Sequence, residues 1–200
     1  MGSGLFRGCR VGLLGGSFNP AHDGHLDISL AALKRLRLHS VWWLVSPQNP
    51  LMDRHTMAPI EDRLAAARVA ARDRRIWVTD LERGLGTNYT VDTLATLTAR
   101  VPGTDFVWLM GADNLAQIPQ WRRWPKIFKT VPIAVFARAT HDLAALSGPA
   151  ARRYGAHRIP PAQAPSLAGL PAPAWAFFPL RHHPASATFI RAAGRWTGGA

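Results

Sequence analysis

The sequence of 200 residues contains a single cysteine, Cys9, so it cannot form an intramolecular disulfide. Disulfides form and persist in oxidising compartments, so a chain that cannot form one internally is typical of the reducing cytoplasm. No apolar run approaches the roughly 20 residues of a membrane span. Arg7 and Arg10 are not followed by a long apolar segment with a cleavage site, so no secretory signal is expected. We therefore expect a cytoplasmic protein that has no membrane partner.

Acidic residues and lysine are also scarce. There are 12 aspartates and glutamates against 24 basic residues, of which only Lys34, Lys126 and Lys129 are lysines. The net charge of +12 favours anionic ligands. Sequence-independent nucleic-acid binding needs a basic patch, whereas these arginines are dispersed apart from short groups such as residues 72–75. We expect no nucleic-acid partner, and a basic nucleic-acid-binding module is the alternative from a different functional class.

Short apolar segments alternate with amphipathic stretches along the chain, which is typical of βαβ units. We expect strands at 11–15, 41–46, 76–81, 106–110, 132–137 and 175–180. Helices are expected at 22–37, 60–72, 90–100, 113–118, 121–129, 141–154 and 186–195. The pattern predicts one α/β domain over residues 1–200, with an N-terminal tail at 1–10 and a Rossmann-like, doubly wound parallel sheet covered by helices on both faces. The proline-rich residues 139–174 are expected to form a surface excursion.

The most informative segment is VGLLGGSFNPAHDGH, residues 11–25. An apolar strand runs into Gly15-Gly16-Ser17, and a turn leads to a helix whose first turn carries His22 and His25. The first N–H groups of a helix attract phosphate, and glycines let the backbone approach an anion. Two histidines three residues apart lie on one helical face, so both can contact one phosphate group. The alternative is an ordinary strand-to-helix turn with two solvated histidines.

Two further segments follow predicted strands, where the carboxyl ends of a parallel sheet form one rim. Gly111 and Asp113 follow the strand at 106–110, and the carboxylate suits the hydroxyls of a ribose. The alternative for Asp113 is a helix N-cap, and Thr90 occupies a similar capping position. Trp121 has an indole that can stack on a pyridine ring, although it can also be a core residue, for which Trp124 is the better candidate.

Near the C-terminus, Ser186 and Thr188 precede Arg191 by about one helical turn. Hydroxyls at a helix start followed by a guanidinium form an anion clamp, because arginine stays charged and holds phosphate oxygens bidentately. A surface helix cap with a solvated arginine is the alternative. The pairing with the glycine and histidine turn favours the clamp.

These segments together resemble the nucleotidylyltransferases that carry HxGH at the first βα junction. Residues 16–25 are similar to the pattern G-x-F-[DN]-P-x-H-x-G-H, and residues 186–191 to [ST]-[SA]-T-x-[IL]-R. TNYTVDTL, residues 87–94, and MGADNLAQIPQWRRW, residues 110–124, resemble segments of the bacterial nicotinate-nucleotide adenylyltransferases. The resemblance covers residues 11–137 and 175–191.

The resemblance implies that nicotinate mononucleotide and ATP are joined to give deamido-NAD and pyrophosphate in NAD biosynthesis, with Mg²⁺ held by the substrate and no protein-held metal. It implies that His22, His25 and Arg191 are catalytic. The resemblance also implies that ATP is bound by Gly15, Gly16, Ser17, Phe18, His22, His25, Gly111, Asp113, Ser186, Thr188 and Arg191. It implies that nicotinate mononucleotide is bound by Ser17, Asn49, Tyr89, Thr90 and Trp121, with the aromatic ring of Trp121 stacked on nicotinate.

One loop departs from the family pattern. SPQNPLM, residues 46–52, resembles a loop that usually ends in lysine, but here Met52 stands in its place and Arg54 is the nearest cation. Two related activities stay open at this point. An enzyme acting on nicotinamide mononucleotide shares the first motif, as does pantetheine-phosphate adenylyltransferase, which the segments at 87–94 and 110–124 disfavour. The oligomeric state is also open, with a homo-oligomer among the possibilities.

Overall fold

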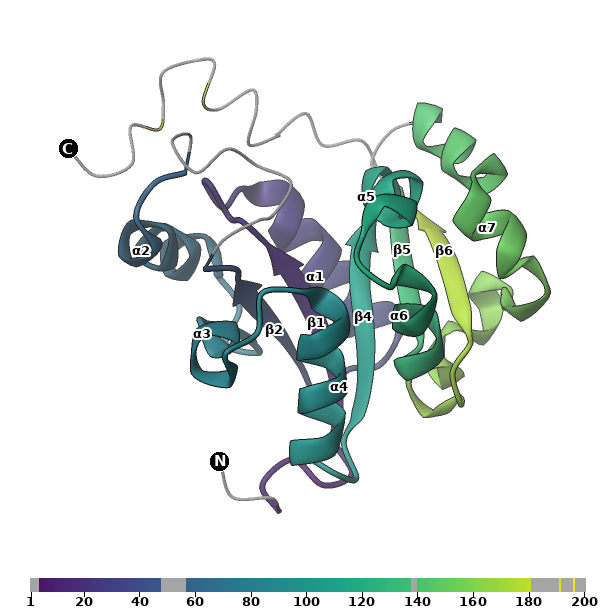
Figure 1. Ribbon diagram of the computed structural model, residues 1–200, viewed down its shortest axis with the longest axis horizontal. Helices are drawn as coiled ribbons and strands as arrows, with labels where there is room; N and C mark the ends of the chain where they lie inside the picture. Colours follow the sequence, from purple (N-terminus) through teal and green to yellow (C-terminus); the bar gives the residue numbers. More distant parts are fainter. Residues whose placement is uncertain (1–3, 48–56, 138–139, 181–190, 192–195, 197–200) are drawn as a thin grey trace.

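The computed structural model describes residues 4–47, 57–137, 140–180, 191 and 196. Its centre is a six-stranded sheet in the order β3-β2-β1-β4-β5-β6, in which every neighbouring pair is parallel (Figure 1). The strands are β1 (Arg10–Gly16), β2 (Ser40–Val45), β3 (Ile76–Thr79), β4 (Asp105–Gly111), β5 (Ile133–Ala137) and β6 (Trp175–Pro179). The order reverses between β1 and β4, and ligands of such sheets bind beyond the carboxyl ends of the strands at that switch point.

Helices cover both faces of the sheet. The α-helices are α1 (Asp23–Arg35), α2 (Ile60–Ala70), α3 (Leu81–Leu85), α4 (Thr90–Arg100), α5 (Ala112–Gln117), α6 (Trp124–Thr130) and α7 (Pro149–Arg153). The 3-10 helices are η2 (Ile118–Gln120), η3 (Thr140–Ser147), η4 (Gly155–His157) and η5 (Pro161–Gly169). Core residues of α4, α5, α6 and α7 pack together on one face, and those of α1, α2 and η5 pack on the other. In Figure 1, α4 and α6 lie in front of the sheet and α1 lies behind it. The predicted doubly wound α/β fold is confirmed.

Leucines at positions 26, 30, 33 and 36 recur at spacings of three and four, which predicts that all four lie on the buried face of α1. The structure differs at one of these positions. Leu26, Leu33 and Leu36 are buried, but Leu30 is 39% exposed. Ser29 takes the inward position instead, because its hydroxyl accepts a hydrogen bond of 2.7 Å from the indole Nε1 of the buried Trp43. A buried indole N–H needs an acceptor, so a polar residue replaces an apolar one at this site.

Residues 139–174 contribute to the core, which corrects the expectation of a surface excursion. Leu167 of η5 is fully buried on the same face of the sheet as α1 and α2. On the other face, the carbonyl of Tyr154 accepts a hydrogen bond of 2.7 Å from Trp175 Nε1. The expected helix at 141–154 is divided into η3 and α7 at Gly148 and Pro149, because proline lacks the N–H and the space needed inside a helix.

Candidate active site

Two of the segments singled out from the sequence follow neighbouring strands and lie at one rim of the sheet. The carboxyl ends of β1 and β4 lie side by side, with Leu14 opposite Leu109. The turn with the two histidines follows β1, and Gly111 and Asp113 end β4 and begin α5. Both segments therefore flank the switch point.

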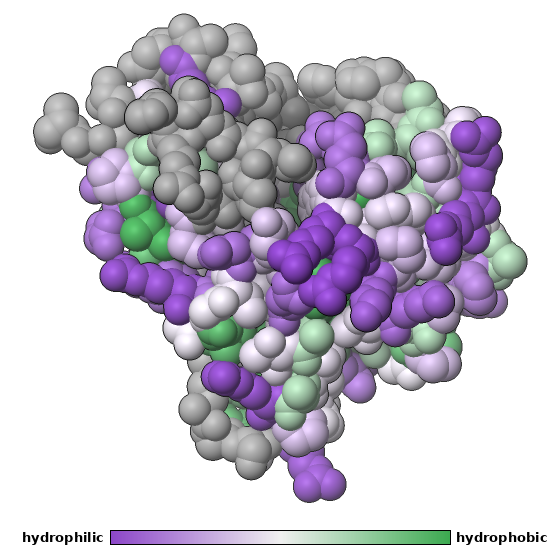
Figure 2. Space-filling model, in the orientation of Figure 1, coloured by the Kyte–Doolittle hydropathy of each residue, from purple (hydrophilic) through white to green (hydrophobic). Residues whose placement is uncertain are grey.

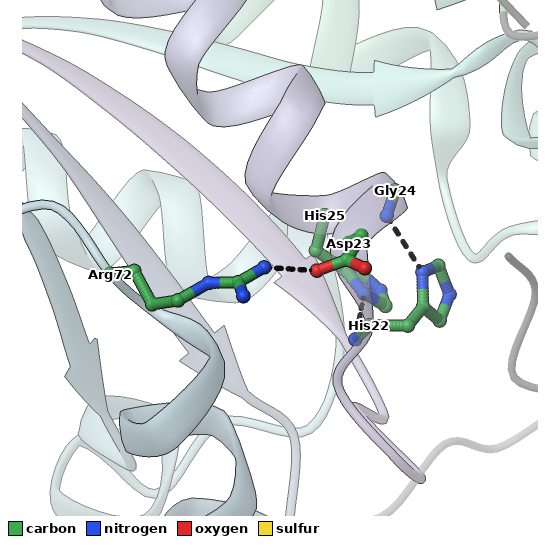
Figure 3. Close-up of polar contacts among 5 residues, drawn as sticks. All are labelled: His22, Asp23, Gly24, His25 and Arg72. Atoms are coloured by element: carbon green, nitrogen blue, oxygen red, sulfur yellow. Dashed lines mark hydrogen bonds and ion pairs between the residues drawn. The ribbon is translucent and has the colours of Figure 1, made fainter. Parts of the chain in front are cut away.

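The two histidines cap the start of α1 together (Figure 3). His22 is the N-cap residue, and its Nδ1 accepts a hydrogen bond of 3.1 Å from the N–H of Gly24. In return, the N–H of His22 donates to Nδ1 of His25 at 3.2 Å. The ring centroids are 3.9 Å apart. This is the reciprocal pattern of a capping box, with imidazoles in place of a hydroxyl and a carboxylate.

The capping bonds determine which ring nitrogen carries the proton. A backbone N–H can donate only to an unprotonated nitrogen, so Nδ1 of His22 and of His25 carries no proton in this arrangement. In a neutral imidazole the proton is then on Nε2. Each neutral ring therefore has an Nε2–H donor, which is the group that a phosphate oxygen needs.

Aromatic side chains support the histidine pair from the sheet side. The ring of Phe18 lies 4.6 Å from that of His25 and stacks on Trp43 at 5.1 Å. Phe18 is 1% exposed and has a φ of 46°, in the left-handed region. Such a conformation is costly for a residue with a Cβ and persists only when its surroundings hold it. Phe18 thus acts as packing for His25 in the structure, in addition to its predicted place in an ATP site.

Gly15 is required by packing as well. A Cβ at this position would lie 2.4 Å from Cη2 of Trp108, which is a buried core residue. At Gly16 the nearest atom would be 3.5 Å away, an ordinary contact distance. The close approach of the Trp108 indole therefore explains the glycine at position 15. Packing does not explain the glycine at position 16, whose predicted role is in the phosphate-binding turn.

An acidic residue also lies in the first turn of α1. Asp23 forms an ion pair with Arg72, which follows α2 (Figure 3). A carboxylate near a helix N-terminus is favourable. Both side chains are at least half exposed, so the pair contributes at most about 1 kcal/mol.

Arg191 lies beside the turn between β1 and α1. Its Nη1 donates a hydrogen bond to the backbone oxygen of Asn19. The side-chain oxygen of Asn19 accepts from Trp196 Nε1 at 3.0 Å and from the N–H of Ala58 at 3.2 Å. The structure therefore brings the predicted guanidinium to the histidine turn, while its role at a phosphate stays a prediction.

The two segments predicted to hold nicotinate also meet. The guanidinium of Arg122 lies 4.7 Å above the ring of Tyr89, and Arg123 forms an ion pair with Asp92. Figure 2 shows hydrophilic side chains gathered at the middle of the face that α4 and α6 cover. Tyr89 is the N-cap residue of α4 and Thr90 is its first helical residue, so the expected capping position of Thr90 is wrong.

Trp121 follows η2 and is half-buried. It packs against the core cluster on the α4 and α6 face. Its Nε1 is buried and has no hydrogen-bond partner among the described residues. Trp124 packs edge-on against Phe128 and Tyr154 at 6.1 and 6.0 Å, but it is half-buried like Trp121, so the structure does not single it out as the better core residue. Trp121 thus combines a packing role with an Nε1–H donor for which the described part of the chain provides no acceptor.

Asp113 is the second residue of α5, whose N-cap is Gly111, so the helix-cap alternative for Asp113 is wrong. A Cβ at Gly111 would lie 2.2 Å from Oδ1 of Asp113. The carboxylate therefore folds back over the glycine at the end of β4. The carboxylate is exposed whereas Gly111 is buried, and the binding of a ribose by these two residues stays a prediction.

Several predicted residues fall outside the described part of the chain: Asn49, Met52, Arg54, Ser186 and Thr188. Among the residues that are described, no group of three histidine, cysteine or acidic side chains gathers to hold a metal ion. Within the same residues, no helix has both the length and the apolar character that crossing a membrane requires.

Sequence reasoning missed a set of buried polar residues behind the rim. Arg63 of α2 is 1% exposed and Glu82 of α3 is 6% exposed. Thr93 of α4 is fully buried, with its Oγ1 2.9 Å from Oε1 of Glu82. The only signal in the sequence was that Arg63 shares a helical face with the core residue Ala67, four positions later.

Burial raises the pKa of Glu82, although hydrogen bonds from Thr93 and Ser46 act in the opposite direction. The folded protein therefore binds a proton at Glu82 more tightly than the unfolded chain does. Stability from this group is present at low pH and is lost as the pH rises above the ordinary value of 4.5. We expect Glu82→Gln, which cannot ionise, to become more stable relative to the wild type as the pH is raised from 5 to 8.

Urea unfolding at several pH values measures this difference. Glu61→Gln is a matched control, because Glu61 is 70% exposed and its pair with Arg83 lies at the surface. A stability difference between Glu82→Gln and the wild type that does not change with pH would contradict the raised pKa.

Comparison with known proteins shows the family to which the chain belongs. Residues 13–193 match the cytidylyltransferase-like family model. A probable nicotinate-nucleotide adenylyltransferase of Cereibacter sphaeroides is 53% identical over 188 residues, covering 94% of this chain and 99% of the relative. One of Parvibaculum lavamentivorans is 53% identical over 193 residues, covering 96% of each chain.

Among solved structures, Plasmodium falciparum nicotinic acid mononucleotide adenylyltransferase complexed with NaAD matches with a TM-score of 0.66. The identity is 15%, and the match covers 92% of this chain and 83% of that chain, which supports the fold. The two bacterial relatives are 53% identical to this chain over nearly their full length, and this similarity establishes the family. The chain therefore belongs to the cytidylyltransferase-like family and, within it, to the nicotinate-nucleotide adenylyltransferases.

Proposed function

We propose that this protein joins nicotinate mononucleotide and ATP to form deamido-NAD and pyrophosphate. The observation that carries the proposal is the pair of imidazoles with rings 3.9 Å apart, held through Nδ1 at the start of α1. Both rings then have Nε2–H as a donor for phosphate, and Arg191 lies at the same turn. The names of the relatives support the same reaction.

The reaction needs alignment more than acid–base chemistry. A phosphate monoester has a second pKa near 6, so the attacking oxygen of the mononucleotide is already deprotonated at neutral pH. That oxygen forms a bond to the α-phosphorus of ATP, and the bond from this phosphorus to the bridging oxygen breaks as pyrophosphate leaves. Donors aimed at the phosphate oxygens stabilise the charge that develops. His22, His25 and Arg191 would supply those donors.

The divalent ion used with ATP is proposed to be Mg²⁺. Mg²⁺ favours phosphate oxygens and water over cages made only of protein ligands. An ion bound in this way would be carried by the phosphates of ATP itself. The chain's own task is then to hold the phosphates.

The two substrates are assigned to opposite sides of the switch point. The turn of Gly16, Ser17 and Phe18 would bind ATP phosphates, and Gly111 with Asp113 would bind its ribose. Tyr89, Thr90 and Trp121 would bind the nicotinate ring. Arg122 lies over the Tyr89 ring, so its positive charge would lie beside that subsite and would favour the carboxylate of nicotinate over the neutral amide of nicotinamide.

Pyrophosphate release from ATP tests the proposal, with nicotinate and nicotinamide mononucleotides compared at equal concentrations. We expect a larger kcat/KM for nicotinate mononucleotide and a product with the mass of deamido-NAD. A larger kcat/KM for nicotinamide mononucleotide would instead identify the activity as that of a nicotinamide-mononucleotide adenylyltransferase. Salt-sensitive DNA or RNA binding without pyrophosphate release would support the nucleic-acid-binding alternative instead.

A further inference from the structure

Arg63 is a buried cation that is bound by backbone carbonyls. Its Nη1 donates to the oxygens of Ser17 and Ser46 at 2.7 and 2.8 Å. Its Nε donates to the oxygen of Ala58 at 2.9 Å, and its Nη2 to that of Pro47 at 3.3 Å. The guanidinium thereby joins three segments: the turn after β1, the end of β2 and the residues before α2.

A buried charge costs free energy unless hydrogen bonds compensate for the lost water. Burial lowers the pKa of Arg63, which is the sign of that cost. The carbonyls of Ser17, Ser46 and Ala58 compensate it, and each then has a fixed position relative to the others. A planar fork of donors suits this task, whereas lysine offers a single point charge.

Glu82 organises the other side of the same rim. Its Oε1 lies 2.9 Å from Oγ1 of Thr93, and that hydroxyl lies 2.9 Å from Oγ1 of Thr87. Thr93 Oγ1 is also 3.2 Å from the backbone oxygen of Tyr89. The backbone N–H of Thr87 donates to the oxygen of Glu82 at 3.0 Å. The carboxyl group of Glu82 therefore acts on the segment from Thr87 to Tyr89 through the hydroxyl of Thr93, while the backbone of Glu82 contacts that segment directly.

Ser46 connects the two groups. Its backbone oxygen accepts from Arg63, and its hydroxyl hydrogen-bonds Glu82. Its N–H donates to the oxygen of Gly16 at 2.9 Å. The end of β2 is thus tied to the turn after β1 on one side and to the segment before α4 on the other.

We propose that Arg63 and Glu82 are positioning residues for adenylyl transfer. Arg63 holds the predicted phosphate-binding turn, and Glu82, together with Thr93, holds the predicted nicotinate-binding segment. Ser46 contacts both charged groups and so fixes the position of the turn relative to the segment. This assignment rests on the proposed function, which places ATP at Ser17 and nicotinate at Tyr89. Neither charged group needs to touch a substrate. Each acts by fixing the backbone that does.

Different kinetic effects are expected from changing Arg63 and from changing Thr93, the partner of Glu82. Arg63→Lys loosens the alignment of the two subsites, so kcat should fall by about 10-fold or more, since small misplacements of reacting groups are costly. Thr93→Val removes one hydroxyl with little change of shape, so KM for nicotinate mononucleotide should rise by about 10-fold while KM for ATP stays within about twofold. Thr93→Ser restores the hydroxyl and should restore that KM.

Steady-state kinetics with each substrate varied in turn measure this split, on variants whose circular dichroism matches the wild type. Arg68→Lys is the matched control for Arg63→Lys, because Arg68 is exposed on the same helix. Calorimetric titration with ATP and with nicotinate mononucleotide separately gives a second readout that does not depend on turnover.

Unchanged kcat in folded Arg63→Lys, or equal changes of both KM values in Thr93→Val, would overturn the positioning role. Should Arg63→Lys fail to fold, the Thr93→Val and Thr93→Ser pair decides, because loss and rescue of one KM cannot follow from general destabilisation. Wild-type protein that forms no deamido-NAD overturns the proposed function instead, and it does so before any variant is compared.

Discussion

Replacing His25 by alanine is expected to lower kcat for deamido-NAD formation by about 10²- to 10³-fold, the usual cost of removing one donor to a charge that develops in the transition state. The KM for nicotinate mononucleotide should change by no more than a few-fold, because His25 lies in the predicted ATP subsite. The steady-state rate of pyrophosphate release, with each substrate varied in turn, measures both constants.

The structure shows why alanine alone is an incomplete test. His25 also accepts the N–H of His22 through Nδ1, so its loss removes a helix cap, which typically costs about 1 kcal/mol. His25→Glu separates the two roles, since glutamate is a natural partner at this capping position but has no N–H donor when ionised. We expect His25→Glu to keep most of the thermal stability and to lose most of the activity.

His157→Ala is a suitable control, because this histidine is exposed and follows α7 in η4, whereas the predicted phosphate site lies at the start of α1. Its kcat should match that of the wild type. If His25→Glu instead retains full kcat, the histidine pair serves only to cap α1, and the ordinary strand-to-helix turn raised as the alternative from the sequence is correct.

The predictable parts of the fold are those in which neighbouring residues decide the outcome. Strands buried on both faces require continuous apolar runs, so all six strands were located from such runs. The helix at 90–100 has the expected bounds because its apolar residues recur at helical spacing and its first residue follows a turn. The histidine turn was located because glycine, proline and histidine follow a strand in one short segment.

The parts that could not be predicted depend on contacts between distant segments. Arg63 is one of 21 arginines in the sequence, and only the folded structure shows that it reaches four carbonyls. Glu82 lies in α3, a five-residue helix that no periodicity reveals. Leu30 was expected inside, but the indole of Trp43 required a hydroxyl on that face.

The second large effect is expected at Trp121. Stacking of an aromatic side chain on a nucleobase contributes about 1–3 kcal/mol by alanine substitution, and a pyridine ring offers a similar face. Trp121→Ala should therefore raise KM for nicotinate mononucleotide by about 10- to 100-fold, at 1.4 kcal/mol for each factor of about ten. KM for ATP should stay within about twofold, and Trp121→Phe should recover most of the loss.

Packing must be separated from stacking in this experiment, because Trp121 is half-buried and contacts the core. Trp77→Ala is the matched control: Trp77 is 46% exposed on the edge strand β3, where it stacks on Trp42 at 6.0 Å. Both variants lose a partly buried indole, but only Trp121 directly precedes Arg122, whose guanidinium lies over the Tyr89 ring. Equal KM values in the two variants, with equal losses of thermal stability, would make Trp121 a core residue and leave nicotinate to be held by other groups.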